Sequence, residues 1–230
     1  MDQAVHKLVA RHFISIRKSV LLLFVFHSSL GQNPEHAGHG ESSSHESYIH
    51  QLEVPGRENW QKPEMVIALF GELRGKTILD LGAGSGYFTF RLAKAAGKVI
   101  AADVNESFLD YIQEKMKNPD HAGESGNIEI RKIPYDNPGL QPGEADGVLI
   151  VNTYHHLSQR IEYFKKVREG MKPGGILLIV DYTKGNGFGP PDSHKIDQET
   201  VLQEIRQSGF TQITSDTDLL EYQYILKCIK

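Results

Sequence analysis

Cysteine is almost absent from this chain of 230 residues, in which Cys228 is the only one. A single cysteine excludes an internal disulfide and any metal site built from several cysteines. Basic residues are not in excess either, since 25 lysines and arginines against 29 acidic residues give a formal net charge of −4. Because basic residues are not in excess, we do not expect nucleic acid to be a partner. The composition, 39% hydrophobic and 23% charged, is typical of a soluble globular protein.

No hydrophobic run in the sequence is long enough to span a bilayer, which takes about 20 residues. The apolar run SVLLLFVF (Ser19 to Phe26) follows the basic pair Arg17 and Lys18 and precedes small residues. This order is typical of a secretory signal. We therefore expect residues 1–31 to be a signal-like segment, with cleavage after Gly31, and the protein to be exported or periplasmic. The alternative is an N-terminal helix that packs on the domain of a cytoplasmic protein.

Histidine is concentrated in the next part of the chain, with five of the eleven histidines between positions 27 and 50. Residues 32–59 are rich in Ser, Gly, Glu and Asn, so we expect a flexible linker. Histidine-rich tracts also bind zinc or copper. However, the spacing of His36, His39, His45 and His50 fits no closed zinc site. A solvated linker is the expectation, and a metal-binding tether is the alternative.

The pattern of residues 60–230 predicts an α/β domain. Its strand-like runs are Thr77–Leu81, Val99–Ala102, Ile128–Arg131, Gly147–Val151, Ile176–Val180, Thr211–Ser215 and Tyr222–Ile229. Helical patterns separate the first five runs, which predicts a doubly wound, mostly parallel sheet of seven strands. No helix separates the last two runs. They are therefore expected to pair antiparallel, because a parallel return needs about a dozen residues or more.

Three alternate glycines follow the first predicted strand in ILDLGAGSGYFT: Gly82, Gly84 and Gly86. Doubly wound sheets bind ligands at this edge, and glycine lets a ligand approach the backbone without meeting a Cβ. A dinucleotide-binding loop requires Gly-x-Gly-x-x-Gly, but Tyr87 occupies the position of the third glycine. A P-loop pattern is also absent from the sequence. The spacing therefore favours neither phosphate-binding loop.

Asp103 ends the second predicted strand in VIAAD, about twenty residues after the glycines. A carboxylate at this place binds the hydroxyls of a ribose, which indicates an adenosine-containing ligand without naming one. The alternative role for Asp103 is to cap the helix that begins near Glu106.

Four segments, ILDLGAGSG, VIAADVN, GVLIVNTYHHL and MKPGGILLIVDY, together resemble the class I S-adenosylmethionine-dependent methyltransferases. The resemblance extends over residues 60–230, and the opening WQKPEMV is similar to methyltransferase domains that act on small molecules. It implies a Rossmann-like sheet whose last strand is antiparallel and lies beside the fifth. It also implies S-adenosylmethionine as the cofactor and a small-molecule methyl acceptor.

The resemblance further implies roles for individual residues. The cofactor-binding positions are Asp80, Gly82, Ala83, Gly84, Gly86, Asp103, Val104, Asn105, Asp136 and Asn152. Asp80 and the glycine loop would hold the methionine portion, and Asp103 the ribose, with Val104 and Asn105 beside the adenosine. Asp136 would approach the adenine amino group. This chain has PYD where Gly-Asp-Ala is more usual.

Methyl transfer from an activated sulfonium requires mainly that the two reactants be positioned. A general base is needed only if the acceptor is protonated. The candidate bases are Tyr154, His155 and His156 after the fourth strand and His194 in the loop GNGFGPPDSHK, with a slight preference for His155. Two other functions stay open here. One is a nucleotide-cofactor oxidoreductase, which Tyr87 disfavours, and the other is a non-enzymatic cofactor- or metal-binding exported protein.

Overall fold

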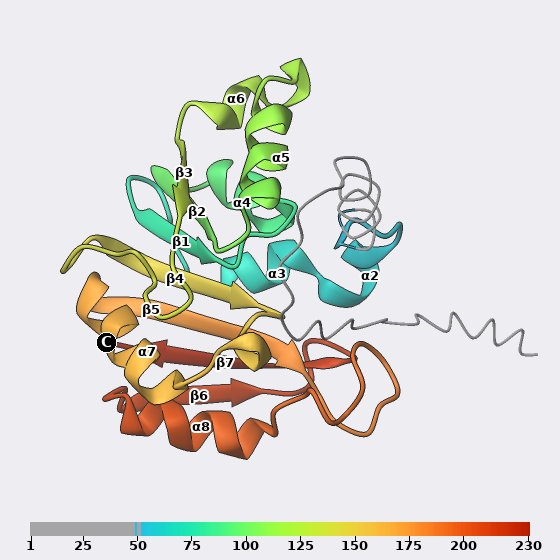
Figure 1. Ribbon diagram of the computed structural model, residues 1–230, viewed down its shortest axis with the longest axis vertical. Helices are drawn as coiled ribbons and strands as arrows, with labels where there is room; N and C mark the ends of the chain where they lie inside the picture. Colours follow the sequence, from blue (N-terminus) through green and yellow to red (C-terminus); the bar gives the residue numbers. More distant parts are fainter. Residues whose placement is uncertain (1–48, 50–51) are drawn as a thin grey trace, which may run out of the picture. The chain divides into compact units, whose positions relative to one another are not determined.

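The computed structural model describes Ile49 and residues 52–230. The signal-like segment, the predicted cleavage point and the histidine tract therefore lie outside the described residues. Figure 1 shows a sheet with helices on both sides. The strands are β1 (Thr77–Leu81), β2 (Lys98–Asp103), β3 (Ile128–Lys132), β4 (Ala145–Val151), β5 (Met171–Tyr182), β6 (Gln212–Asp216) and β7 (Gln223–Ile229). The α-helices are α2 (Arg57–Gln61), α3 (Pro63–Ala68), α4 (Tyr87–Ala93), α5 (Glu106–Met116), α6 (Ala122–Ser125), α7 (Arg160–Gly170) and α8 (Gln198–Gln207).

The sheet has seven strands in the order β3-β2-β1-β4-β5-β7-β6. Strands β1 to β5 pair in parallel, whereas β7 runs antiparallel to both of its neighbours, β5 and β6. The link from β6 to β7 is too short for a parallel return, as the sequence predicted. The structure thus confirms the predicted doubly wound, mostly parallel sheet, with the last strand inserted beside the fifth.

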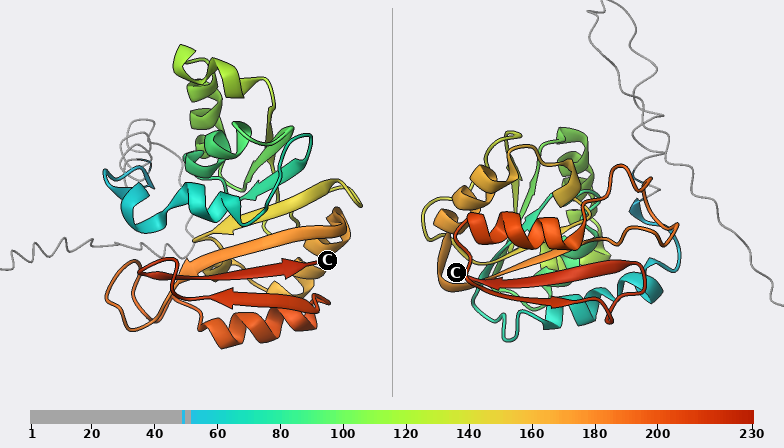
Figure 2. Two further views of the ribbon diagram at one scale, coloured as in Figure 1. Left: turned by 180° about the vertical axis from the view of Figure 1, so that it is seen from behind. Right: turned by 90° about the horizontal axis from the view of Figure 1, so that it is seen from below.

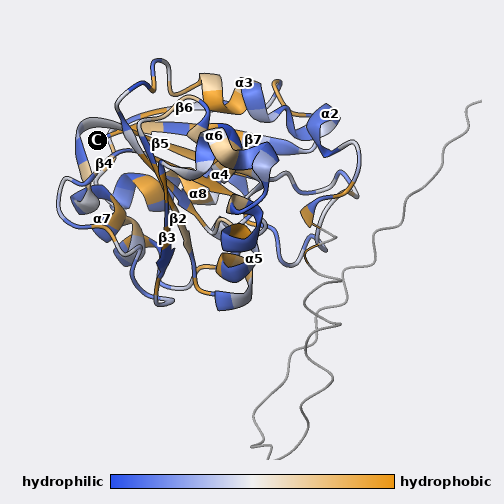
Figure 3. Ribbon diagram, turned by 90° about the horizontal axis from the view of Figure 1, so that it is seen from above, coloured by the Kyte–Doolittle hydropathy of each residue, from blue (hydrophilic) through white to orange (hydrophobic). Residues whose placement is uncertain are grey.

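Successive side chains of each strand point to opposite faces of the sheet, so the sheet has two hydrophobic layers. Leu79 of β1 packs in the layer that includes Phe164 of α7 and Ile205 of α8. Its neighbour Ile78 packs in the layer that includes Val66 of α3 and Ile112 of α5. The views in Figure 2 show helices on both faces, and Figure 3 shows hydrophobic residues gathered on the strands between them. Over the described residues, no helix combines the length and the apolar character needed to cross a membrane.

The start of α5 shows how local sequence orients the edge where the site lies. The side chain of Asn105 caps this helix by accepting a hydrogen bond from the N–H of Ser107 at 3.0 Å. Asp103 does not cap the helix, so its alternative role is excluded. Its carboxylate instead accepts the N–H of Asn105 at 2.9 Å and stays at the carboxyl end of β2.

The folded unit begins earlier than residue 60, the predicted domain boundary. Helix α2 starts at Arg57, and its residues Arg57 and Gln61 are buried. Pro63 occupies the first turn of α3, where its missing N–H and fixed φ are compatible with the start of a helix. The last residues of the predicted linker therefore belong to the domain, and α2 packs at the carboxyl edge of the sheet.

Candidate active site

A cavity of about 520 Å³ lies at the carboxyl ends of β1, β2 and β4. Its volume is within the usual range for small-molecule sites, about 300–1,000 Å³. The predicted cofactor residues that line it are Asp80, Gly82, Ala83, Gly84, Asp103, Val104, Asn105 and Asn152. The tertiary structure therefore gathers eight of these positions around one hollow.

Asp103 is fixed in place before any ligand binds. Its side chain is only 6% exposed, and its two carboxylate oxygens accept the N–H groups of Gly84 at 3.0 Å and Asn105 at 2.9 Å. Burial raises the pKa of this carboxyl, while the backbone hydrogen bonds act in the opposite direction. A rigid carboxylate at the end of β2 is suited to accept hydrogen bonds from vicinal hydroxyls.

The three glycines of the loop are required for different reasons. All three have a positive φ, which is +77° at Gly82, +54° at Gly84 and +80° at Gly86. This backbone conformation is unfavourable for residues that have a Cβ. A Cβ at Gly82 would lie 2.4 Å from the side chain of Thr153, and one at Gly86 would lie 3.0 Å from Phe90. At Gly84, which lines the cavity, a Cβ would lie 3.1 Å from the side chain of Leu52 and would project towards the space for a ligand. Close ligand approach thus explains Gly84, and internal packing explains Gly82 and Gly86; Gly86 does not line the cavity.

Asp80 ends β1 beneath the glycine loop and is 3% exposed. Its carboxylate accepts a hydrogen bond of 2.6 Å from the hydroxyl of Thr89 in α4. Burial raises the pKa of Asp80 to about 6, with a smaller opposing effect from the Thr89 hydrogen bond. At neutral pH the cavity therefore contains a buried carboxylate that is mostly ionised.

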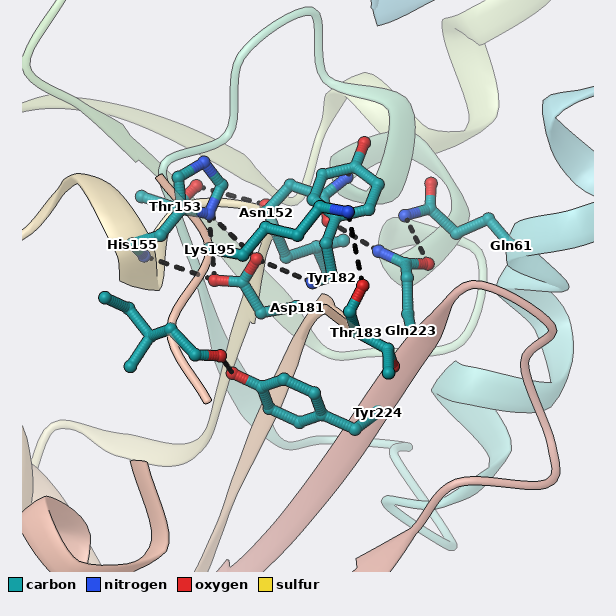
Figure 4. Close-up of polar contacts among 12 residues, drawn as sticks. Gln61, Asn152, Thr153, His155, Asp181, Tyr182, Thr183, Lys195, Gln223 and Tyr224 are labelled. Atoms are coloured by element: carbon teal, nitrogen blue, oxygen red, sulfur yellow. Dashed lines mark hydrogen bonds and ion pairs between the residues drawn. The ribbon is translucent and has the colours of Figure 1, made fainter. Parts of the chain in front are cut away.

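Asn152 follows β4 in the left-handed conformation, with φ of +55°. A chain of amides holds its side chain (Figure 4). Gln61 donates to Gln223 at 3.2 Å, Gln223 donates to Asn152 at 2.5 Å, and Asn152 donates to the hydroxyl of Tyr182 at 3.1 Å. Each amide has a defined direction, so Asn152 presents a fixed orientation to the cavity.

The candidate bases occupy different environments. His155, the preferred one, does not line the cavity; its side chain is 3% exposed and its Nδ1 lies 2.8 Å from the carboxylate of Asp181 (Figure 4). Tyr154 is buried in the core and donates to Glu204 at 2.6 Å, and burial raises its pKa. The ring of His156 lies 4.1 Å from that of His155 and lines the cavity. The structure therefore favours His156 over His155 as the candidate general base.

Burial lowers the pKa of His156 to about 4, and a smaller contribution comes from His155. His194 is exposed and does not line the cavity, but its charge also lowers the pKa of His156, so the two side chains are near one another. His156 is thus neutral at pH 7, which is the form that accepts a proton.

Asp136 is not part of the cavity. Its side chain is 83% exposed and lies 3.8 Å from the ammonium group of Lys166 in α7. Ile133 and Tyr135, which precede it in the same loop, line the cavity instead. The structure therefore places Asp136 away from the position that the resemblance implied for it, because the loop directs its side chain to solvent.

Comparisons with known proteins agree with this geometry. Residues 78–175 match the family model described as a methyltransferase domain. The crystal structure of a SAM dependent methyltransferase from Aquifex aeolicus is similar to this chain at a TM-score of 0.72 and 27% identity, over 80% of this chain and 97% of that one. The chain therefore has the class I methyltransferase fold, and its residues 78–175 are similar to a methyltransferase domain.

Two further relatives define how far the likeness extends. The crystal structure of a putative type 11 methyltransferase from Sulfolobus solfataricus has the same fold as this chain, with a TM-score of 0.60 and 21% identity over 74% of this chain and 91% of that one. The ubiquinone/menaquinone biosynthesis C-methyltransferase UbiE of Escherichia coli O1:K1 / APEC is 32% identical over 117 residues, which are 50% of this chain and 45% of the relative. This chain thus spans about half the length of the curated relatives that it matches.

Several residues of the site were not predicted from the sequence. Arg57 and Leu52 line the cavity, although both lie in the segment predicted to be a linker. Gln61 and Gln223 are separated by 162 positions and meet only in the folded methyltransferase domain. No periodicity or motif spacing marks these residues, and the likeness of the WQKPEMV segment to small-molecule methyltransferase domains assigned none of them to the site.

Proposed function

We propose that the protein transfers a methyl group from S-adenosylmethionine to a small-molecule acceptor. The observation that carries this proposal is the position of Asp103, fixed by Gly84 and Asn105 at the rim of the cavity within a class I methyltransferase domain. The Aquifex aeolicus methyltransferase is described as SAM dependent, and the solved structure of a Haemonchus contortus phosphoethanolamine N-methyltransferase, which shares the fold, is a complex with S-adenosyl-L-methionine.

The described residues fit this cofactor. Gly84 lines the cavity with bare backbone, and the hydroxyls of Ser85 and Tyr87 are buried without hydrogen-bond partners among the described residues. Asp103 would hold the ribose and Asp80 the amino-acid portion. When bound, S-adenosylmethionine supplies an activated sulfonium methyl group.

The chain's own residues position the groups that line the cavity. Asn152, oriented by Gln223, and Thr153, packed against Gly82, form the wall of the cavity at the end of β4. His156 lines the same cavity as a neutral imidazole and would accept the acceptor's proton where the acceptor is protonated. The acceptor's chemistry decides whether this step is used, because an unprotonated nucleophile requires positioning alone.

Calorimetry on the full-length protein tests the proposal directly. We expect binding of S-adenosylmethionine and S-adenosylhomocysteine and no binding of NAD. Binding of NAD without either adenosyl ligand would instead favour an oxidoreductase. An acceptor screen with a methyl-labelled cofactor then identifies the substrate class, with the Asp103→Ala variant as the control in which cofactor binding is weakened.

A further inference from the structure

Arg57 is a buried arginine that forms no ion pair with any of the described residues. Its side chain lines the cavity from α2, and the residue is 9% exposed. Its Nε donates to the side-chain oxygen of Gln61 at 2.5 Å, and one terminal nitrogen donates to the carbonyl of Leu52. Among the described residues no carboxylate lies within ion-pair distance. Burying a guanidinium without an anion is costly, so its place at the cavity needs an explanation.

The surroundings of Arg57 increase that cost. Its guanidinium lies 4.0 Å from the ring centroid of Tyr87, and the guanidinium of Arg91 lies 3.9 Å from the same ring. Arg91 is half-buried and has an anionic partner, Glu64, at 3.4 Å. In the described part of the chain, Arg57 contacts the ring and two neutral acceptors and forms no ion pair. Two cations therefore share one aromatic side chain, and the only charge of opposite sign that faces Arg57 in the cavity is the more distant carboxylate of Asp80, among the described residues.

Unpartnered donors accompany the guanidinium. The hydroxyls of Ser85 and Tyr87 are buried and have no hydrogen-bond partner among the described residues, and both residues line the cavity. Buried polar groups are normally paired, so such orphans indicate a missing ligand. A guanidinium with two hydroxyl donors is suited to bind a carboxylate, to which arginine donates in a planar fork.

The cavity also contains the opposite charge. Asp80 lines the same hollow, yet its carboxylate and the Arg57 guanidinium do not form an ion pair in the described part of the chain. An α-amino acid group carries an ammonium and a carboxylate close together. A separated buried carboxylate and guanidinium are complementary to that zwitterion.

We propose that Arg57 binds the α-carboxylate of the amino-acid portion of the cofactor, assisted by the hydroxyls of Ser85 and Tyr87. The inference rests on the proposed function, and it concerns a residue outside the matched segment 78–175. Because Gln61 is itself held by Gln223 of β7, the guanidinium is oriented before the ligand arrives. The Arg57–Gln61–Gln223 contacts thus connect α2 to the sheet edge.

Two ligands that differ in the amino-acid group provide the test. S-adenosylhomocysteine carries the carboxylate and ammonium, whereas 5′-methylthioadenosine keeps the adenosine and thioether but lacks both. We expect Arg57→Gln in the full-length protein to weaken S-adenosylhomocysteine about 10- to 100-fold, the scale of a hydrogen-bonded charged group. The affinity for 5′-methylthioadenosine should stay within about twofold, the ordinary variation at a site that is not in contact. Arg57→Lys should restore part of the loss, because it keeps the charge and loses the planar fork.

Arg91→Gln is the matched control, since it removes the other cation from Tyr87 and should change neither affinity. An equal loss for both ligands in Arg57→Gln would overturn the proposal, because Arg57 would then act on the fold or on the adenosine. Unchanged affinity for S-adenosylhomocysteine would overturn it in favour of a carboxylate supplied by the acceptor. If the wild-type protein binds neither ligand, the proposed function itself fails, and the inference fails with it.

Discussion

The backbone N–H of Gly84 lies 3.0 Å from the Oδ2 atom of Asp103 and donates a hydrogen bond to it. This contact joins the loop after β1 to the end of β2, two strands that are neighbours in the sheet. The other carboxylate oxygen accepts the N–H of Asn105. The glycine loop and the carboxylate are therefore one rigid unit, and a change at either residue affects the shape of the other.

Replacing Asp103 tests this unit. Asp103→Ala should weaken S-adenosylhomocysteine by about 1–3 kcal/mol, because hydrogen bonds to a charged group are lost. Calorimetry provides the affinity. Asp146→Ala is the control: Asp146 of β4 also accepts a backbone N–H, that of Thr77 at 2.9 Å, but it lies beside the first residue of β1, at the edge of the sheet opposite the cavity. Equal effects of the two variants on affinity would show that Asp103 acts only through stability.

Gly84→Val tests the ligand approach. The backbone φ of +54° and the 3.1 Å contact with Leu52 leave no room for a branched side chain in the cavity, so we expect binding to be abolished. Gly143→Val is the matched control, because Gly143 has a φ of +66° and no atom within 4 Å of its ideal Cβ. Both variants should lose stability from backbone strain, and only the first should lose affinity. If calorimetry showed that Gly84→Val retains its affinity for S-adenosylhomocysteine, the glycine loop would not be part of the binding site.

Asp80 makes stability depend on pH. Its pKa is raised from 3.8 in the unfolded chain to about 6 in the folded protein, so the folded state holds the proton more tightly. The resulting stabilisation is fully present below about pH 4 and is lost as the pH rises through about 6, a change of up to about 3 kcal/mol. Asp80→Asn mimics the protonated form and should show no such loss. Urea unfolding at intervals from pH 4 to 7.5 should therefore favour the variant increasingly at higher pH, and parallel curves would contradict the expectation.

His156 should remain neutral through the physiological range, because burial lowers its pKa from 6.5 to about 4. NMR titration of labelled histidine side chains measures this, and His156→Gln identifies the resonance by its loss. The unfolded chain binds a proton here more readily, so the contribution of His156 to stability is present above about pH 6.5 and is lost as the pH falls towards 4. A midpoint near 6.5 would show an exposed ring and argue against a role as a base in the cavity.

Export is a separate prediction, from residues 1–31. The run from Ser19 to Phe26 and the small residues after it indicate cleavage after Gly31, so the mature chain should begin near Gln32. N-terminal sequencing of protein from its native host measures the start of the chain. Thermal melts of the full-length chain and of a chain without residues 1–31 complete the test. If the N-terminal segment were a helix packed on the domain, its removal would lower the melting temperature. An uncleaved terminus with a large loss of stability on truncation would favour a cytoplasmic protein.

Local patterns in the sequence were sufficient for the sheet and for the centre of the site. Alternation of strand and helix patterns predicted seven strands, and the missing helix before Tyr222–Ile229 predicted the antiparallel return, because both depend on residues close together in the chain. The glycines and Asp103 were found in the same way, since positive φ and the end of a strand are local properties.

Tertiary packing alone decided which side chains face the cavity. His155 and His156 are adjacent in sequence, yet the first pairs with Asp181 and the second lines the hollow, because the turn after β4 directs them differently. Asp136 points to solvent for a similar reason. Arg57 is held at the cavity by its hydrogen bond to Gln61, and Gln61 in turn donates to Gln223, which is 162 positions later in the sequence. No local sequence pattern relates residues so far apart. The sequence by itself determined the sheet and the loop at its edge, whereas long-range packing determined the charges and orientations around the ligand.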